Sequence, residues 1–255
     1  MTAQIDALVQ DDPTAFYTYD EYTAAAAMLK ETVKLRAASV QGQLDGSIPS
    51  TRDGQSEDSS SLIDVSAIDL SVMGIMNGGG QGGPGGGFGG DSAASLNYID
   101  DELSSYETIW ESSVFKSTDK DHRRVITALK NICADDADSE SLAESMDVDN
   151  ILRYMAVQTF VVNLDSLSGS MAHNYYLYED DGKLNLIPWD YNLAFGGFQA
   201  GSASETINFP IDTPFSSGVD PEDRQFFMAL LENETYIAQY HAYLSQLVEE
   251  YVNGG

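Results

Sequence analysis

The sequence is poor in positive charge, and this shortage excludes one class of partner. Only 12 Lys and Arg stand against 41 Asp and Glu, which gives a formal net charge of −29. Nucleic acids are bound by clustered basic side chains, so we expect no nucleic-acid partner. Acidic surfaces favour cations and basic polypeptides, or simply serve solubility in a salty medium. Where the charge serves binding, it predicts a basic polypeptide as partner.

Cysteine is also scarce, because Cys133 is the only one. The chain can form neither an internal disulfide nor a cysteine-based zinc site. Cys133 lies between Ile132 and Ala134 on an apolar helix face, which favours a packing role. The first residues contain neither a cationic segment nor an apolar run, so we expect no signal peptide. No stretch reaches the roughly 18 apolar residues that a membrane-spanning helix requires.

The first third of the chain divides into a helical region, a polar arm and a glycine tract. Thr18 and Glu21 predict a capping box before a helix that we expect to end at Gly42. Residues 45–76 are polar and Ser-rich, which predicts an extended arm on the surface. Residues 77–91 are almost pure glycine and predict a flexible linker. A phosphate-binding loop is the alternative there, but no strand precedes the tract and no Gly-Lys-Ser or Gly-Lys-Thr follows it.

Residues 92–255 predict a helical core around one hairpin. Thr118 and Asp147 are expected to cap two helices, and the second is apolar enough to be the buried central helix. A short helix is expected around residues 141–146, a loop over 198–220 and a helical pair from Pro221 onward. We therefore predict an α+β fold that is mostly helical, with region 1–76, linker 77–91 and core 92–255.

Polar side chains flank the predicted hairpin at both of its ends. Residues 175–179 are rich in aromatic side chains, residues 180–182 are turn sequence, and residues 184–188 alternate apolar with polar. Asp165 and Asn174 precede this hairpin, and Asp190 follows it. Because a hairpin brings its two ends together, we expect these three side chains to converge on one site.

Protein kinases place the same side-chain types in the same order around two short strands. Their first Asp orients the acceptor hydroxyl, an Asn follows, and a second Asp holds metal ahead of an aromatic residue and Gly. Asp165, Asn174 and Asp190 match this order. The match has departures, because no His-Arg precedes Asp165 and Phe195-Gly196 lies five residues past Asp190. On these residues alone, Asp165 and Asn174 are also compatible with ordinary turn chemistry.

Three separated blocks make the pattern more specific, namely Asn163–Ser166, His173–Tyr178 and Ile187–Asn192. In this order they resemble the CotH family, the spore coat protein H-like atypical protein kinases, over about residues 95–255. The resemblance implies a kinase-like C-lobe that transfers the ATP γ-phosphate to Ser or Thr hydroxyls of proteins with Mg²⁺ or Mn²⁺. It implies that Asp165 is catalytic and that Asn174 and Asp190 bind the nucleotide and its metal.

Neighbouring residues are expected to support this site. His173 is predicted to orient the loop through a hydrogen bond rather than to act as a base. Asn163 and Asn192 are predicted to lie just behind the site, and Trp189 and Phe195 to hold the loop by packing.

A kinase also needs a small lobe with a Lys that grips the phosphates and pairs with a helix Glu. No Lys lies in a convincing strand before Asp165, so we expect the N-lobe to be reduced or missing. Residues 3–76 resemble the family's C-terminal helical part but come first, which predicts a rearranged or circularly permuted order.

Three functions stay open. The first is an atypical protein Ser/Thr kinase, and the second is a non-catalytic coat or cell-surface binding protein that retains a kinase-like core. The third is cation binding by acidic loops. The resemblance implies a location in the spore coat or at the cell surface.

Overall fold

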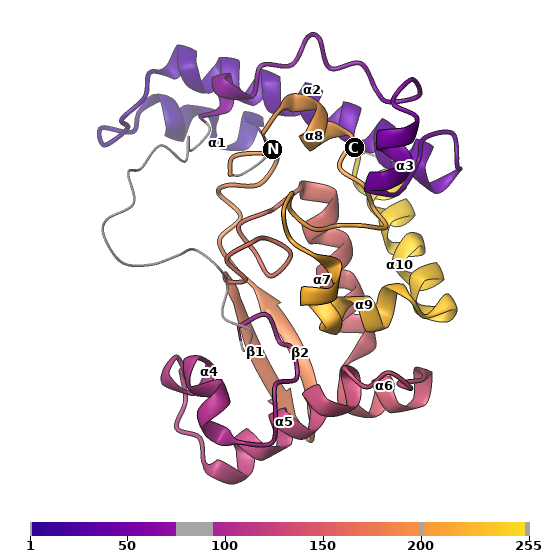
Figure 1. Ribbon diagram of the computed structural model, residues 1–255. Helices are drawn as coiled ribbons and strands as arrows, with labels where there is room; N and C mark the ends of the chain where they lie inside the picture. Colours follow the sequence, from indigo (N-terminus) through magenta and orange to yellow (C-terminus); the bar gives the residue numbers. More distant parts are fainter. Residues whose placement is uncertain (1, 75–93, 199–200, 253–255) are drawn as a thin grey trace.

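The computed structural model describes residues 2–74, 94–198 and 201–252, and helices dominate this part of the chain (Figure 1). The sheet in the described residues has two antiparallel strands. The predicted α+β, mostly helical class is therefore confirmed. The glycine tract that we predict to be a linker lies outside the described residues.

The elements before the tract are helices α1 (Thr2–Gln10), α2 (Tyr19–Leu44) and α3 (Arg52–Glu57), and the 3-10 turn η1 (Leu70–Met73). Thr18 and Glu21 form the predicted capping box at the start of α2. The predicted end at Gly42 is wrong, because Gly42 is buried inside the helix, where a Cβ atom would lie 2.7 Å from Ile48 Cδ1. The chain leaves the helix at Gly46, whose φ is +79°.

The predicted extended arm is wrong where α3 and η1 form. Both elements have side-chain caps that stabilise a helical turn in a polar segment. Thr51 Oγ1 accepts from Gly54 N at the start of α3, and Asp69 Oδ1 accepts from Ser71 N at the start of η1.

The elements between the tract and the hairpin are η2 (Leu103–Tyr106), α4 (Glu107–Glu111), α5 (Asp119–Ile132), α6 (Ser139–Ser145) and α7 (Val148–Val161). The predicted capping box at Thr118 starts α5, and Asp147 Oδ1 accepts from Asn150 N at the start of α7. Both predicted starts are confirmed. The predicted burial of the central helix is also confirmed, since Ile151 and Leu152 have no exposed surface.

The hairpin consists of β1 (Tyr175–Asp180) and β2 (Lys183–Pro188), as predicted. Asp181 and Gly182 form its turn with φ of +51° and +86°, and two positive φ values match the right-handed twist of paired strands. The inner face carries Leu184 and Leu186, which are buried against α7. Asp147 N donates to Leu184 O, so the start of α7 and β2 are fixed to each other.

The last elements are α8 (Ala203–Ile207), η3 (Pro221–Arg224), α9 (Gln225–Leu231), α10 (Glu234–Gln246) and the π-helical turn η4 (Leu247–Val252). Pro221 begins a helical turn as predicted, although the turn is 3-10. The loop predicted over 198–220 is wrong at α8, where Ser202 Oγ accepts from Glu205 N and caps a short helix.

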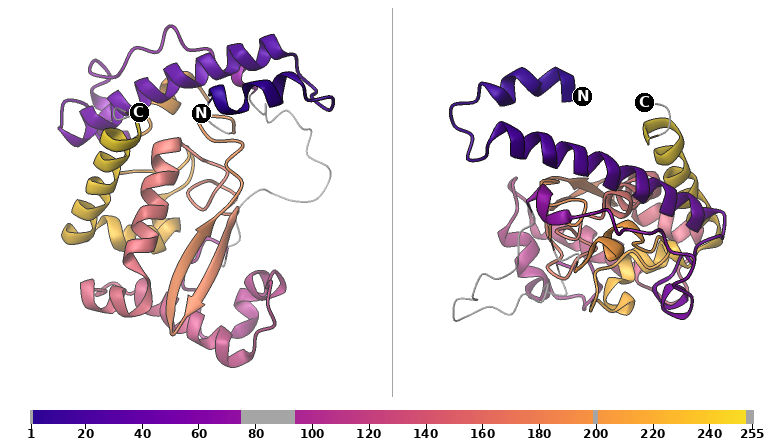
Figure 2. Two further views of the ribbon diagram at one scale, coloured as in Figure 1. Left: turned by 180° about the vertical axis from the view of Figure 1, so that it is seen from behind. Right: turned by 90° about the horizontal axis from the view of Figure 1, so that it is seen from above.

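Helix α7 lies at the centre of this arrangement (Figure 1). Helix α10 packs along one side of it and the hairpin along the other, while α2 crosses one end (Figure 2). Helix α1 and η4 both contact α2. One large apolar cluster joins these elements and includes Val40, Leu152, Leu186 and Tyr240. The packing therefore fixes both the end of α7 and the base of the hairpin.

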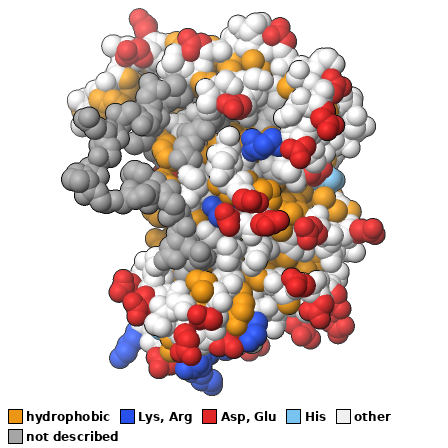
Figure 3. Space-filling model, viewed as in Figure 1, with side chains coloured by type: hydrophobic (Ala, Val, Ile, Leu, Met, Phe, Trp, Pro, Cys, Tyr) orange, Lys and Arg blue, Asp and Glu red, His pale blue; other side chains and the backbone are white. Residues whose placement is uncertain are grey.

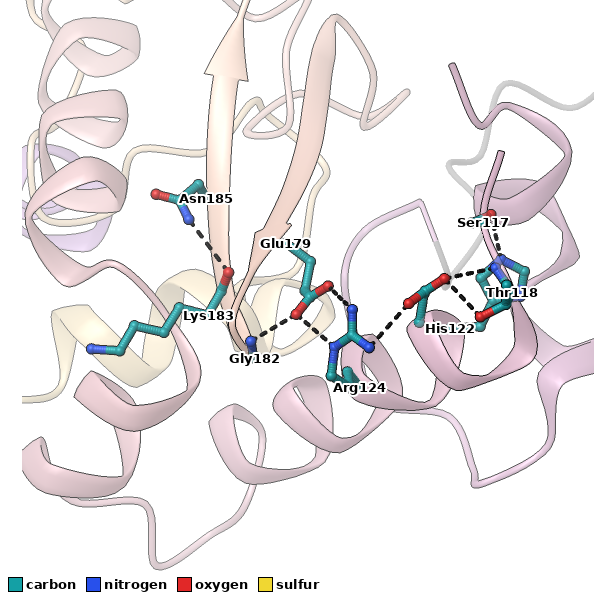
Figure 4. Close-up of polar contacts among 9 residues, drawn as sticks. Ser117, Thr118, His122, Arg124, Glu179, Gly182, Lys183 and Asn185 are labelled. Atoms are coloured by element: carbon teal, nitrogen blue, oxygen red, sulfur yellow. Dashed lines mark hydrogen bonds and ion pairs between the residues drawn. The ribbon is translucent and has the colours of Figure 1, made fainter. Parts of the chain in front are cut away.

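At its turn, the hairpin is tied to α5 by a bidentate ion pair (Figure 4). Arg124 Nε and Nη2 donate to the two carboxylate oxygens of Glu179 at 2.8 and 2.7 Å, and Gly182 N donates to the same carboxylate. Arg124 also contacts Asp121. The hydrogen bonds from Arg124 lower the pKa of Glu179.

We expect Glu179→Gln to lower the free energy of unfolding by about 1 kcal/mol, because Arg124 is partly exposed and water screens the pair. A lowered folded-state pKa stabilises the protein fully above the ordinary Glu pKa of about 4.3, and this contribution is lost as the pH falls through the lowered value. Thermal unfolding against pH measures the difference between parent and variant. Glu31→Gln is the control, because its pair with Lys34 is well exposed. An equal effect of both substitutions would contradict the assignment.

Candidate functional site

The loop after α7 is buried over its whole length. Helix α7 ends at Val161, the next residue Val162 has left-handed backbone, and every residue from 162 to 169 is buried. The loop closes tightly on itself, since Gly169 N donates to Ser166 O. A Cβ atom on Gly169 would lie 1.8 Å from Leu164 O, so this position requires glycine. The fold therefore delivers Asp165 on a short, fully packed segment.

Asp165 and Asn174 meet directly. Asn174 Nδ2 donates to Asp165 O at 2.8 Å and to Asp165 Oδ2 at 3.0 Å. Both side chains are buried, with 7% and 6% of their residue surface exposed. One amide group thus fixes the backbone and the carboxylate of Asp165 together. No described residue donates to the amide oxygen of Asn174, which can therefore serve as an acceptor or metal ligand.

The second carboxylate oxygen of Asp165 is in contact with His173. The distance from His173 Nε2 to Asp165 Oδ1 is 2.9 Å, which is within ion-pair range, although Oδ1 receives no hydrogen bond. The imidazole donates to Oδ1 in the tautomer that carries a proton on Nε2. The predicted role of His173 in orienting the loop agrees with this contact.

Asp190 lies at the other end of the hairpin base. Trp189 N donates to Asn174 O at 3.3 Å, so Asp190 is one residue past a backbone contact with Asn174. Its side chain is exposed and touches neither Asp165 nor Asn174 within the described residues. The structure therefore joins Asp165 to Asn174 and places Asp190 beside them without direct contact.

Left-handed backbone is concentrated around these residues. Seven described residues other than glycine have positive φ, and five of them flank this site: Val162, Ala172, Asn174, Asp190 and Phe195. Asn and Asp tolerate this conformation, whereas for Val it is a clear outlier. Strained backbone of this kind persists where the surrounding structure fixes it, and it is common at functional sites.

The residues predicted to support the site have mixed outcomes. Asn163 is fully buried, and its Oδ1 accepts from Asp165 N at 3.2 Å. Phe195 packs against the core, and its N donates to Val161 O at 2.6 Å. The packing role predicted for Trp189 is wrong, because 45% of this residue is exposed on the outer hairpin face. Asn192 is exposed and has no contact with the site among the described residues.

Two further polar residues lie near the loop without any sequence signal. Gln158, which is buried on α7, donates from Nε2 to Tyr191 OH at 3.3 Å. Burial raises the pKa of Tyr191 to about 12, so its hydroxyl is neutral at physiological pH. A Gln inside a helix and a Tyr after a strand are too common to be identified from sequence.

The oxygen atoms at the hairpin base fit a metal that arrives with phosphate ligands. The described residues hold no group of three His, Cys, Asp or Glu side chains that could form a closed metal site. Mg²⁺ is usually bound by one or two carboxylates together with substrate phosphates. Within the described ranges the Asp190 carboxylate and the Asn174 amide oxygen have no hydrogen-bond partner, and they match this smaller ligand set.

One face of the molecule is acidic, and few basic side chains lie there, with hydrophobic side chains between the carboxylates (Figure 3). Asp165, Asn174 and Asp190 have no contact with Lys or Arg in the described part of the chain. No described helix is long and apolar enough to span a membrane.

The fold and site define a mostly helical α+β protein with an acid–amide pair at the base of a hairpin. The family model described as CotH kinase protein matches residues 52–254, which is most of the chain. The chain belongs to the CotH family. No curated protein and no solved structure matches it. The predicted rearrangement of segments stays a prediction.

We expect Asn174→Asp to destabilise the protein by about 2 kcal/mol at neutral pH, because it removes a buried donor and places a second carboxylate against Asp165. The loss shrinks as the pH falls, since the paired acids then share a proton. Chemical denaturation across pH measures this. Asn192→Asp adds the same charge at an exposed position and is expected to change stability little. A similar loss in both variants would refute the buried contact.

Proposed function

We propose that this chain carries the acidic half of a phosphoryl-transfer site in a kinase-like C-lobe. The reaction is transfer of the ATP γ-phosphate to Ser or Thr hydroxyls of proteins. The observation that carries the proposal is the buried hydrogen-bonded pair of Asp165 and Asn174 at the hairpin base. Family membership supports the reaction class, and the order of the three polar residues supports their roles.

Asp165 is the residue that orients the acceptor hydroxyl. Its Oδ2 is held by Asn174, whereas Oδ1 is buried beside His173 Nε2, so an acceptor hydroxyl would reach Oδ1 only after the His173 side chain moves aside. His173 contacts Oδ1 and restricts where the hydroxyl can lie. Rigid placement of the reacting groups accounts for much of phosphoryl-transfer catalysis.

Asn174 and Asp190 are the residues that would hold Mg²⁺ or Mn²⁺. The metal, when bound, neutralises charge on the β- and γ-phosphates. The exposure of Asp190 suits this role, because a carboxylate that meets an incoming metal–nucleotide complex must be reachable. The left-handed backbone at Asn174 and Asp190 fixes both side chains on the two sides of the hairpin base.

The outer face of the hairpin supplies an aromatic surface for the base. Tyr176 and Trp189 stack on each other with ring centroids 6.0 Å apart, and both are nearly half exposed. Exposed aromatic rings stack on nucleobases with little base preference. Trp189 adjoins Asp190, so a stacked base and a metal-bound phosphate chain lie within one short segment.

The protein substrate is expected to be basic or Ser-rich. With a net charge of −29, the chain attracts polycationic segments and repels acidic ones. Family membership favours a location in the spore coat or at the cell surface.

A non-catalytic binding protein is the second candidate, and one observation favours it. In the described residues, β1 is the first strand and follows Asp165, so no described Lys before Asp165 lies on a strand. The phosphate-gripping Lys of kinases lies on a strand. A family member without this contact can retain the fold and bind partners without transferring phosphate.

We expect ATP with Mn²⁺ to raise the melting temperature of the parent, and neither compound alone to do so. At a concentration 100 times the dissociation constant the stabilisation is about 2.7 kcal/mol. Asp190→Asn is expected to abolish this shift, because it removes the metal carboxylate. Asp165→Asn is expected to keep the shift but to abolish transfer of radiolabelled phosphate to a basic, Ser-rich peptide.

Asp181→Asn is the matched control, because Asp181 lies at the opposite end of the hairpin and also has positive φ. It is expected to behave like the parent. Phosphate transfer that persists in Asp190→Asn would reject the mechanism. Absence of any ATP-dependent shift in the parent would favour the binding protein, and a shift with Mn²⁺ alone would favour simple cation binding.

Trp189 fluorescence tests the stacking surface. The chain has two Trp residues, so the variant Trp110→Phe makes Trp189 the sole reporter. We expect ATP with Mn²⁺ to quench its emission, and Trp189→Ala to weaken nucleotide binding about tenfold, because base stacking contributes about 1–3 kcal/mol. Trp189→Phe, in which Trp110 reports, is the control and is expected to show no quenching. Equal quenching in both single-Trp variants would contradict stacking on Trp189.

A further inference from the structure

Two buried arginines hold the backbone on either side of Asp165. Arg36 on α2 is fully buried, and Arg224 at the end of η3 is 5% exposed. Neither guanidinium has a carboxylate within ion-pair distance among the described residues, although acids outnumber bases more than threefold in this chain. Both donate to backbone carbonyl groups instead. A buried charge without a counter-charge is costly, so this placement calls for a physical reason.

Arg36 grips the end of α7. Its Nη2 donates to Thr159 O at 2.9 Å and its Nε to Phe160 O at 3.2 Å, while Nη1 donates to Ile207 O and Phe209 O. The last carbonyls of a helix lack partners within the helix and carry partial negative charge, which a cation stabilises. Burial lowers the pKa of Arg36 to about 9, so the guanidinium is still charged at neutral pH.

Arg224 grips the other side of the same loop. Its Nε donates to Leu167 O at 3.1 Å and its Nη2 to Gly169 O at 2.7 Å, while Nη1 donates to Ser95 Oγ at 3.1 Å. Leu167 and Gly169 belong to the buried segment that carries Asp165, so their carbonyls cannot reach water. The planar guanidinium of Arg holds its N–H donors in a fixed geometry that matches both carbonyl groups, which the ammonium group of Lys does not reproduce.

We propose that Arg36 and Arg224 are positioning residues that hold the Asp165 loop from its two ends. Arg36 fixes where the loop leaves α7, and Arg224 fixes its closing turn. Between these two anchors, Asn174 aligns the carboxylate itself. For catalysis the inference rests on the proposed phosphoryl transfer, but the geometric part is independent of any reaction.

The test uses the full chain and a signal that reports on the loop. The three His residues give separate imidazole resonances, which single His→Gln variants assign. His173 contacts Asp165, whereas His122 stacks on Trp110 and His241 contacts Asp212. Arg224→Lys keeps the positive charge but replaces the planar guanidinium and its several N–H donors with an ammonium group. We expect it to shift the His173 resonance while His122 and His241 keep theirs.

Arg36→Lys is expected to move the His173 resonance as well, and His122 remains its control. Ser95→Ala removes one hydrogen-bond partner of Arg224 and leaves no buried carbonyl group unpaired. We expect it to shift the His173 resonance in the same direction as Arg224→Lys, but by less. It also provides a folded variant if Arg224→Lys does not fold. Arg153→Lys, at an exposed position on α7, is the matched control and leaves all three resonances unchanged. An unmoved His173 resonance in the folded variants, or equal movement of all three, overturns the proposal.

Phosphate transfer separates this inference from the proposed function. If the parent transfers phosphate, Arg224→Lys is expected to lower kcat about tenfold to a hundredfold, since small misplacements of reacting groups cost this much. The ATP-dependent rise in melting temperature is expected to persist, because Asp190 lies outside the loop of residues 162–169 that the two arginines hold. If the parent transfers none, the proposed function fails, and the His173 resonance still decides whether the arginines position the loop.

Discussion

The backbone polar groups of one buried loop need hydrogen-bond partners, and distant parts of the structure supply them. Residues 162–169 are all buried, yet they form neither helix nor strand, so their carbonyl groups need partners outside regular structure. Those partners come from distant parts of the chain: Arg224, Asn174, Ser216 and the loop itself. Arg36 serves the carbonyls just before them. Because these donors lie on α2, η3 and the hairpin base, the loop is placed only when all of these elements are assembled.

This constraint links stability to the site. The hydrogen bonds that satisfy the backbone of the loop also hold Asp165 in place. We therefore expect a change in packing at α2 or η3 to alter the position of the Asp165 carboxylate. Asp190 differs from Asp165 in this respect, because its side chain is exposed, its backbone is left-handed, and no described residue forms a hydrogen bond or ion pair with its carboxylate. Asp165, which we propose to orient a hydroxyl, is thus buried, and Asp190, which we propose to bind the metal complex, is exposed.

The sequence was sufficient for the local features and for the family. Capping residues located the starts of α2, α5 and α7, and the Asp181-Gly182 turn located the hairpin, because these signals act within a few residues. The expected convergence of Asp165, Asn174 and Asp190 is only partly seen: the hairpin ends meet through Trp189 N and Asn174 O, and Asn174 also binds Asp165, but no hydrogen bond links Asp190 to either residue in the described part of the chain. The roles of Arg36 and Arg224 could not be predicted, because their partners lie up to 173 residues away. The expected helix end at Gly42 was wrong because this glycine makes room for the Ile48 side chain inside the helix, which local sequence rules do not reveal.

The distribution of positive charge explains why a metal ion is indispensable to the proposed reaction. The chain has few basic residues, and four of its arginines are engaged elsewhere: Arg36 and Arg224 on backbone carbonyls, Arg124 on Glu179 and Arg153 on Asp149. In the described residues no Lys or Arg contacts Asp165, Asn174 or Asp190. A nucleotide phosphate chain near these carboxylates is therefore repelled unless cations come with it. In the proposed reaction, the acidity that disfavours free ATP would favour both its metal complex and a basic substrate.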